Sequence, residues 1–208
     1  MTGTSEAPAR RLTAKGLATR ERIVGAAAEL IYEHGVQNTN NEQIRAAAGV
    51  SGSQLARHFP AKEDLVRAVI ELRAEDILAR HRIPEFGELD SFEALRRWAD
   101  LAVESPGMLR GGCLFGSLAA ETVKAEPVHR GALAEGFERW EQLFRHGLGR
   151  MRERGELRPE ADPVALTHLL VAAFQGGMLL DQAAGETSPL RDALDGALAY
   201  VESFAVPR

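Results

Sequence analysis

One segment near the N-terminus limits the possible folds of this chain more than any other. It extends from Asn41 to Lys62 and reads NEQIRAAAGVSGSQLARHFPAK. Two short amphipathic patterns lie on either side of Gly49, a residue that can adopt the positive φ with which many helices end. Ser51 or Ser53 can cap the second pattern through its hydroxyl group. The segment therefore predicts two short helices joined by a tight turn.

Polar side chains gather near the start of the second short helix. Helix-turn-helix proteins place such side chains against base edges and phosphates in the major groove of DNA. We predict that Ser53 and Gln54 read bases. The predicted phosphate contacts come from Asn41, Arg57, His58 and Lys62.

The same segment resembles the DNA-binding domain of TetR-family transcriptional regulators. That family typically has Val-Ser, three variable residues, Leu-Tyr, a variable residue, His-Phe, two further residues and Lys. The matching residues here are Val50, Ser51, Leu55, His58, Phe59 and Lys62. The resemblance covers residues 19–66 and implies an all-α fold. It places an N-terminal helix-turn-helix domain at 19–66 and a helical domain for effector binding and dimerisation at 67–208.

Three positions depart from the family pattern. Ala56 stands where the family usually has a Tyr that contacts the DNA backbone, and Ser53 stands where Gly or Pro is common. Arg45 replaces a small residue that usually faces the partner helix. We expect the Arg45 side chain to extend outward and reach a phosphate. The departures leave open an adaptor that binds an effector but has degenerate DNA binding.

The distribution of charge fits contact with DNA at one end of the molecule. The chain has 208 residues and a net charge of −5, which argues against a general nucleic-acid binder. Residues 1–67 hold nine Lys and Arg against seven Asp and Glu, whereas residues 68–208 hold sixteen against twenty-three. A mildly basic head on an acidic body suits docking by the head. The single Cys, with no secretory signal and no apolar run long enough to span a membrane, predicts a cytoplasmic protein.

Periodicity predicts helices along the rest of the chain. Residues 1–18 are small, polar and basic, and we expect them to be disordered. Arg10, Arg11 and Lys15 could form an arm along the DNA, although a solvated tail is the favoured interpretation. Helices are expected at about 19–34, 62–80, 90–105, 112–124, 128–154, 162–184 and 188–205.

The family resemblance implies a ligand cavity in the second domain. Bulky apolar side chains of its central helices are the candidate lining: Trp98, Phe115, Phe137, Trp140, Phe144, Phe174 and Met178. Each of these is more often plain core than cavity wall. Among them, His168 and Gln175 could orient a ligand. The expected effector is a small apolar or amphipathic molecule.

Cys113 stands at the start of a predicted helix and is a further candidate for ligand binding. A helix N-terminus favours the reactive thiolate, which permits an electrophile or oxidant sensor. The favoured interpretation is a small apolar packing residue, because the local sequence offers little that would activate the thiol.

The last two predicted helices are rich in apolar residues. In TetR-like proteins the final helices of two subunits form a four-helix dimer interface, and the resemblance predicts one here. The expected interface residues are Val164, Leu180, Leu190, Leu194, Leu198 and Val201. The alternative is that both helices cover only the core of their own chain. A dimer would read a palindromic operator in double-stranded DNA.

Catalytic motifs are missing from the sequence. It contains no Gly-rich phosphate loop, no Gly-x-Ser-x-Gly and no His-Glu-x-x-His, and no zinc-ligand spacing, so we expect no cofactor and no metal. An all-α enzyme using Glu121 or Asp181 is the remaining alternative. The predicted function is a transcriptional repressor. Its effector would move the helix from Lys62 to Arg80 and so release DNA.

Overall fold

The computed structural model describes residues 13–104, 112–125 and 127–207, and within these ranges every regular element is helical. The all-α prediction is confirmed. The described residues also contain one isolated antiparallel β-bridge, between Leu157 and Ala205. The elements are α1 (Ala14–His34), α2 (Asn41–Ala48), α3 (Gly52–His58), α4 (Lys62–His81), η1 (Pro84–Phe86), α5 (Phe92–Glu104), α7 (Leu114–Ala125), η2 (Pro127–His129), α8 (Arg130–Glu153), α9 (Pro163–Ala184) and α10 (Ser188–Glu202).

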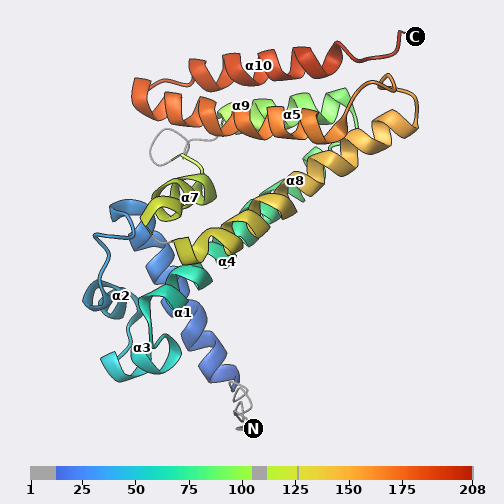
Figure 1. Ribbon diagram of the computed structural model, residues 1–208. Helices are drawn as coiled ribbons and strands as arrows, with labels where there is room; N and C mark the ends of the chain where they lie inside the picture. The colour runs from blue at the N-terminus through green and yellow to red at the C-terminus, as the bar shows by residue number, and fades with distance from the viewer. Residues whose placement is uncertain (1–12, 105–111, 126, 208) are drawn as a thin grey trace, which may run out of the picture.

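The helices form two groups that two long helices connect (Figure 1). Helices α1, α2 and α3 lie together at one end of the molecule, and α5, α9 and α10 lie at the other. Helices α4 and α8 run side by side between the two groups, and α7 packs against α1, α4 and α8. Helix α4 therefore extends from the N-terminal group into the second group.

Local capping explains why α2 and α3 form where they do. The side chain of Asn40 accepts hydrogen bonds from the first turn of α2, and Gly49 ends that helix with a φ of 61°. The Ser51 side chain accepts from the backbone N–H of Gln54 and so caps α3. The expected role of Gly49 is confirmed, and of the two candidate serines it is Ser51 that caps.

Helix α1 begins earlier than the sequence predicted. It starts at Ala14 rather than near residue 19, because the hydroxyl of Thr13 accepts the N–H of Gly16 at 3.2 Å. Lys15 therefore belongs to a helix and not to a disordered tail. Arg10 and Arg11 lie outside the described residues.

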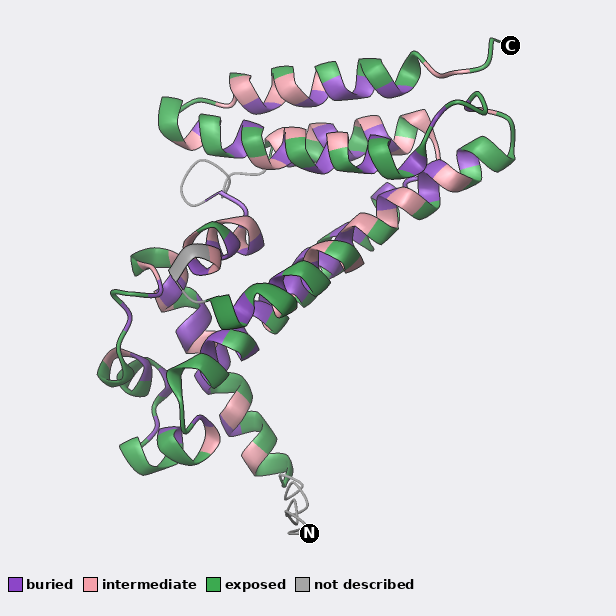
Figure 2. Cartoon of the chain, in the orientation of Figure 1, coloured by how far each residue is buried: buried purple, intermediate pink, exposed green. Residues whose placement is uncertain are grey.

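Buried residues lie on the sides of α1, α4, α8 and α9 that face neighbouring helices (Figure 2). Aromatic rings fill the middle of this core. Trp98, Trp140 and Phe144 are each at most 2% exposed, and the Trp98 and Phe144 rings lie 4.8 Å apart. The core joins both groups of helices.

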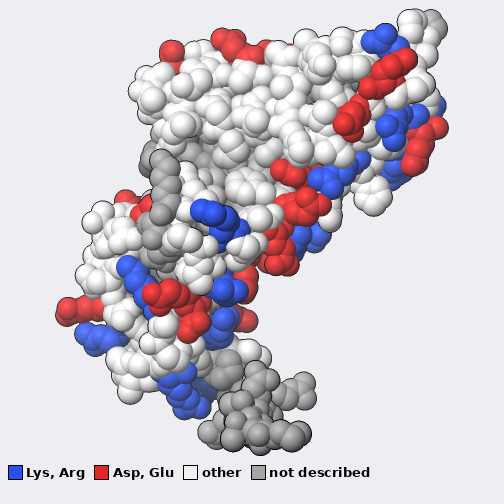
Figure 3. All heavy atoms as spheres, viewed as in Figure 1, with Lys and Arg blue, Asp and Glu red and all other residues white. Residues whose placement is uncertain are grey.

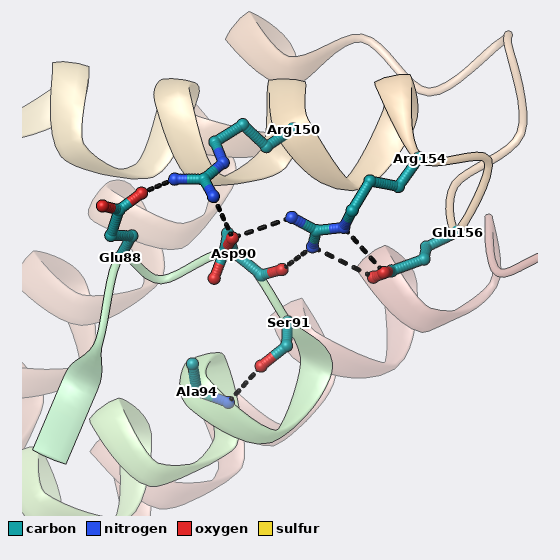
Figure 4. A network of polar contacts seen from close by, with 7 residues as sticks. All are labelled: Glu88, Asp90, Ser91, Ala94, Arg150, Arg154 and Glu156. Carbon is teal, nitrogen blue, oxygen red and sulfur yellow. Dashed lines mark hydrogen bonds and ion pairs between the residues drawn. The ribbon is translucent and has the colours of Figure 1, made fainter.

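Ion pairs fix the segment before α5 to the end of α8 (Figure 4). Arg150 pairs with Glu88 and Asp90, and Arg154 pairs with Asp90 at 2.8 Å and with Glu156 at 2.8 Å. These groups are partly exposed, so each pair contributes little by itself. Together they hold the chain between η1 and α5 against α8.

The sequence predicted no segment that could span a membrane, but α9 is long and apolar enough to span one by length and composition alone. It packs against α8 and α10, and a core helix of a soluble protein passes the same test.

Candidate functional site

The outward surface of α3 carries the side chains predicted to read bases. Ser53, Gln54 and Arg57 are exposed, whereas Leu55 is buried against the core. Phe59, just after the helix, is also buried. The helix is thus held by its apolar residues and presents its polar side chains to solvent, as a recognition helix must.

Gln54 has one of its two polar groups already engaged. The backbone N–H of Ser51 donates to Oε1 of Gln54 at 2.8 Å, which completes a reciprocal capping box. The side-chain amide N–H groups of Gln54 make no hydrogen bond with the described residues. Gln54 therefore has free amide donors for a molecule that approaches α3, while the capping box holds its oxygen toward Ser51.

The residues predicted to contact phosphates lie on α2, on α3 and at the start of α4. Asn41 is the first residue of α2 and is exposed, and Arg45 on the same helix is exposed as expected. His58 is half-buried at the end of α3. Sequence reasoning missed Arg20 of α1, whose guanidinium lies 4.9 Å from the centre of the Phe59 ring. Nothing in the local sequence of α1 signals that contact.

Lys62 has a structural partner that the sequence did not indicate. Its Nζ donates to the carbonyl oxygen of Val36, in the loop between α1 and α2, at 2.8 Å. The N–H of Val36 donates to Oε1 of Glu121 on α7 at 2.5 Å. One loop residue is therefore bound by the start of α4 and by α7.

A cavity of about 610 Å³ lies between α1, α4, α5, α7 and α9. Its volume is within the range of small-molecule sites, which is roughly 300–1,000 Å³. Its wall is mainly apolar and aromatic, with a few charged and polar groups. The lining residues are Tyr32, Arg73, Asp76, Ile77, Arg80, His81, Ile83, Phe86, Trp98, Leu101, Ala102, Gly112, Cys113, Leu114, Phe115 and Phe174.

His81 is the central polar residue of the cavity wall, and sequence reasoning missed it. Its Nδ1 lies 2.8 Å from the carbonyl oxygen of Ile77 and must donate, because a carbonyl oxygen only accepts. Its Nε2 accepts from the indole N–H groups of Trp98 at 2.9 Å and Trp140 at 3.0 Å. Burial lowers the pKa of His81 to about 4, so the ring is neutral at pH 7. The available signal was periodicity, since His81 continues the apolar stripe of α4.

Four of the predicted cavity residues line the cavity, and six do not. The four are Trp98, Cys113, Phe115 and Phe174. Trp140 and Phe144 lie behind the wall as buried core, Phe137 packs on Phe115, and Met178 is buried elsewhere on α9. The two polar candidates, Gln175 and His168, do not line the cavity either. Gln175 is half-buried and faces Gly116, and His168 is 60% exposed near Glu141, because α9 turns that side outward.

The predicted dimer residues divide between the two sides of α9 and α10. Val164 and Leu180 are 40% and 56% exposed. In contrast, four residues of α10 are at most 2% exposed: Leu190, Leu194, Leu198 and Val201. Assigning these four to a dimer interface was wrong, because they pack against α9 and α5 of their own chain.

Two family models match this chain. Residues 23–69 match the bacterial regulatory proteins of the tetR family, and residues 92–197 match the tetracyclin repressor-like C-terminal domain. Together the two matches cover most of the chain. This family consists of transcriptional regulators rather than enzymes, which decides against the enzyme alternative.

Individual relatives agree with this assignment. The HTH-type transcriptional repressor DhaR of Mycobacterium sp. (strain GP1) is 27% identical over 161 residues, which cover 77% of this chain and 80% of that protein. The HTH-type transcriptional regulator UidR of Escherichia coli (strain K12) is 38% identical over 66 residues, only 32% of this chain and 34% of that protein. A TetR transcriptional regulator from Chloroflexus aurantiacus J-10-FL has a similar crystal structure, with a TM-score of 0.80, 28% identity, and coverage of 93% of this chain and 98% of that one. The chain therefore belongs to the TetR family and is a DNA-binding transcriptional regulator.

Proposed function

We propose that this regulator is a homodimeric repressor that binds a palindromic operator and that a small-molecule effector releases it. The observation that carries the proposal is that α4 and α7 belong to both functional regions. Helix α4 begins at Lys62 beside α3 and ends with Arg80 and His81 at the cavity. Helix α7 begins at the cavity and continues to Glu121, which holds the loop between α1 and α2. A ligand that displaces either helix changes the position of α3.

Ser53 and Gln54 are the proposed base-reading residues. The free donor of Gln54 fits the acceptors of the major groove, which are O6 and N7 of guanine, N7 of adenine and O4 of thymine. Bidentate recognition of adenine also needs the amide oxygen to face the base, whereas the capping box holds that oxygen toward the Ser51 N–H. We therefore propose that Gln54 reads a guanine or a thymine.

The proposed phosphate contacts come from side chains on both sides of α3: Asn41, Arg45, Arg57, His58 and Lys62. Such contacts fix the position of the protein on the duplex without reading its sequence. They would also compensate for Ala56, which offers no hydroxyl to the DNA backbone. Because each cation displaces counterions from DNA, this set predicts binding that weakens with salt.

The outward faces of α9 and α10 are the proposed dimer surface. In the view of Figure 3 the surface over α9 carries almost no charge, and the one ionisable acid of that helix, Asp181, is buried. Exposed small and apolar residues cover these faces: Ala165, Ala172, Gly176, Leu179, Leu180, Ala183, Gly196, Ala199 and Tyr200. Two copies packed through such faces form a four-helix bundle. Their recognition helices would read half-sites about 34–36 Å apart.

Repression is the proposed direction of control, and the cytoplasm is the proposed place of action. DhaR, which matches over most of this chain, is described as a repressor. An effector reverses repression only if it binds the DNA-incompetent state better than the DNA-bound state.

The deciding experiment is selection of genomic DNA fragments by the purified protein at physiological salt, followed by sequencing. A short palindrome is the expected product. Gln54→Glu is the matched variant, because it keeps an oxygen for the capping box but replaces the donor with a second acceptor. It should shift the selected base toward cytosine, whose N4 donates. Absence of any enriched sequence would favour the adaptor without specific DNA binding.

Effector release has its own test. Any compound that calorimetry shows to bind should lower the affinity for the selected operator by about 5–150-fold, the usual range of allosteric coupling. A compound that saturates the protein and leaves operator affinity unchanged would contradict release by that compound.

A further inference from the structure

The two arginines of the cavity wall differ in their ion-pair partners. Arg73 is buried and donates to Asp76 at 3.0 Å and to Glu29 at 2.9 Å. Two carboxylates therefore engage this guanidinium, which leaves it no free donor group for an anionic ligand. The three groups together carry a net charge of −1, and the outer carboxylate, Glu29, is 69% exposed to solvent.

Arg80 lines the same cavity without such a partner. No carboxylate of the described residues lies within 4.0 Å of its guanidinium, and that side chain makes no hydrogen bond there. Asp76 precedes it by one helical turn but is held by Arg73. Arg80 is exposed to solvent and lines the cavity, so its guanidinium can meet a ligand that binds there.

The hydroxyl group of Tyr32 adds a second donor on this side. It makes no hydrogen bond with the part of the chain that the structure describes, although the residue is half-buried and lines the cavity. Burial raises the pKa of Tyr32, which keeps the phenol protonated at neutral pH. A protonated phenol can donate to an anion, whereas a phenolate would repel it.

The remaining wall of the cavity fits an apolar body. Trp98 and Phe174 lie with their ring centres 5.6 Å apart, and Phe86, Leu101 and Phe115 extend the apolar surface. The neutral His81 uses both ring nitrogens within the protein and offers no charge to a ligand. The cavity therefore combines an apolar lining with the unused donors of Arg80 and Tyr32.

We propose that the effector is a small carboxylate with an aromatic or aliphatic body, whose anionic group is held by Arg80 and Tyr32. One unpaired guanidinium matches one negative charge, and its planar donors suit a carboxylate. This inference rests on the proposed function, because it assumes that the cavity is the effector site.

Calorimetry with two matched pairs of probes tests the charge requirement. The pairs are 2-naphthoate with 2-naphthamide, and decanoate with decanamide, in which the two members differ mainly in charge. The wild-type protein should bind each acid at least tenfold more tightly than its amide. Arg80→Gln should abolish this preference, and Tyr32→Phe should reduce the affinity for the acids by a few-fold.

Arg82→Gln is the matched control. Arg82 is also exposed near the end of α4 and loses the same charge, but it does not line the cavity. This variant should keep the full preference for acids. Circular dichroism melting of each variant verifies that it is folded.

Several results would overturn the inference: acids that bind no more tightly than their amides, an Arg80→Gln variant that keeps the preference, or no binding of either acid. The proposed function fails separately, in the operator experiments. Amides that bind as well as acids and release the operator would leave effector control intact and overturn only the requirement for an anion.

Discussion

The carboxylate of Glu121 on α7 accepts a hydrogen bond from the backbone N–H of Val36, and the distance between Oε1 and N is 2.5 Å. This contact joins α7 to the loop that precedes α2. Gly35 permits the close approach, since its φ is +83° and a Cβ there would lie 2.8 Å from the same Oε1. Val36 also accepts from Lys62, so the loop is held between α7 and α4.

Glu121→Ala should release this loop from α7. The N–H of Val36, a residue only 1% exposed, would lose its partner, which should lower the free energy of unfolding by about 1–2 kcal/mol. Hydrogen exchange should accelerate at the Val36 and Gln37 amides. Glu160→Ala removes an exposed carboxylate elsewhere and serves as the control. Unchanged protection of the Val36 amide would show that the contact does not hold the loop in solution.

His81 should make the stability of the protein fall in mild acid. Its pKa is 6.5 in its ordinary state and about 4 in the fold, where burial disfavours the charged ring. The unfolded chain therefore binds a proton that the folded chain does not, and stability is lost as the pH falls from about 6.5 to about 4. The full effect corresponds to about 3 kcal/mol.

Urea denaturation at pH 7, 6 and 5 measures this loss. His81→Gln should have a flatter dependence over the same range, because an amide oxygen can accept the indole N–H groups but does not titrate. The same slope in both proteins would assign the acid sensitivity to other groups.

Lys62→Ala should weaken binding to all DNA sequences about equally. If the ammonium group contacts a phosphate, its loss reduces the salt dependence of log K by about one unit. Loss of the bond to the Val36 carbonyl should also destabilise the loop. Lys62→Arg keeps the charge and should keep the salt slope. Filter binding at a series of salt concentrations measures the affinity for DNA and the salt slope. A wild-type slope in Lys62→Ala would show that Lys62 bonds to Val36 but does not contact a phosphate.

Leu180→Glu should convert the protein to a monomer. Leu180 is 56% exposed on the proposed dimer surface, and a charge there would be buried between two copies. Analytical ultracentrifugation should show a lower mass, and operator affinity should fall by orders of magnitude because one recognition helix makes few contacts. Val128→Glu is the control, since Val128 is 59% exposed on η2, away from α9 and α10. A Leu180→Glu protein that stays dimeric would place the interface elsewhere.

The sequence by itself determined the helix-turn-helix segment. Gly49, Ser51 and the polar start of α3 act within a few residues of one another, through backbone conformation and capping hydrogen bonds. Such short-range signals depend little on the rest of the fold. The same holds for most helix positions, since periodicity and Pro or Gly breaks are local.

Only the tertiary structure decided which side of an apolar helix packs against another helix. The stripe from Leu190 to Val201 predicted an interface equally well between chains or within one, and packing against α9 and α5 placed it within. His81 meets Trp98 and Trp140 across 17 and 59 residues, and Glu121 meets Val36 across 85. No periodicity in one helix encodes such contacts, because they depend on how distant helices pack around a common core.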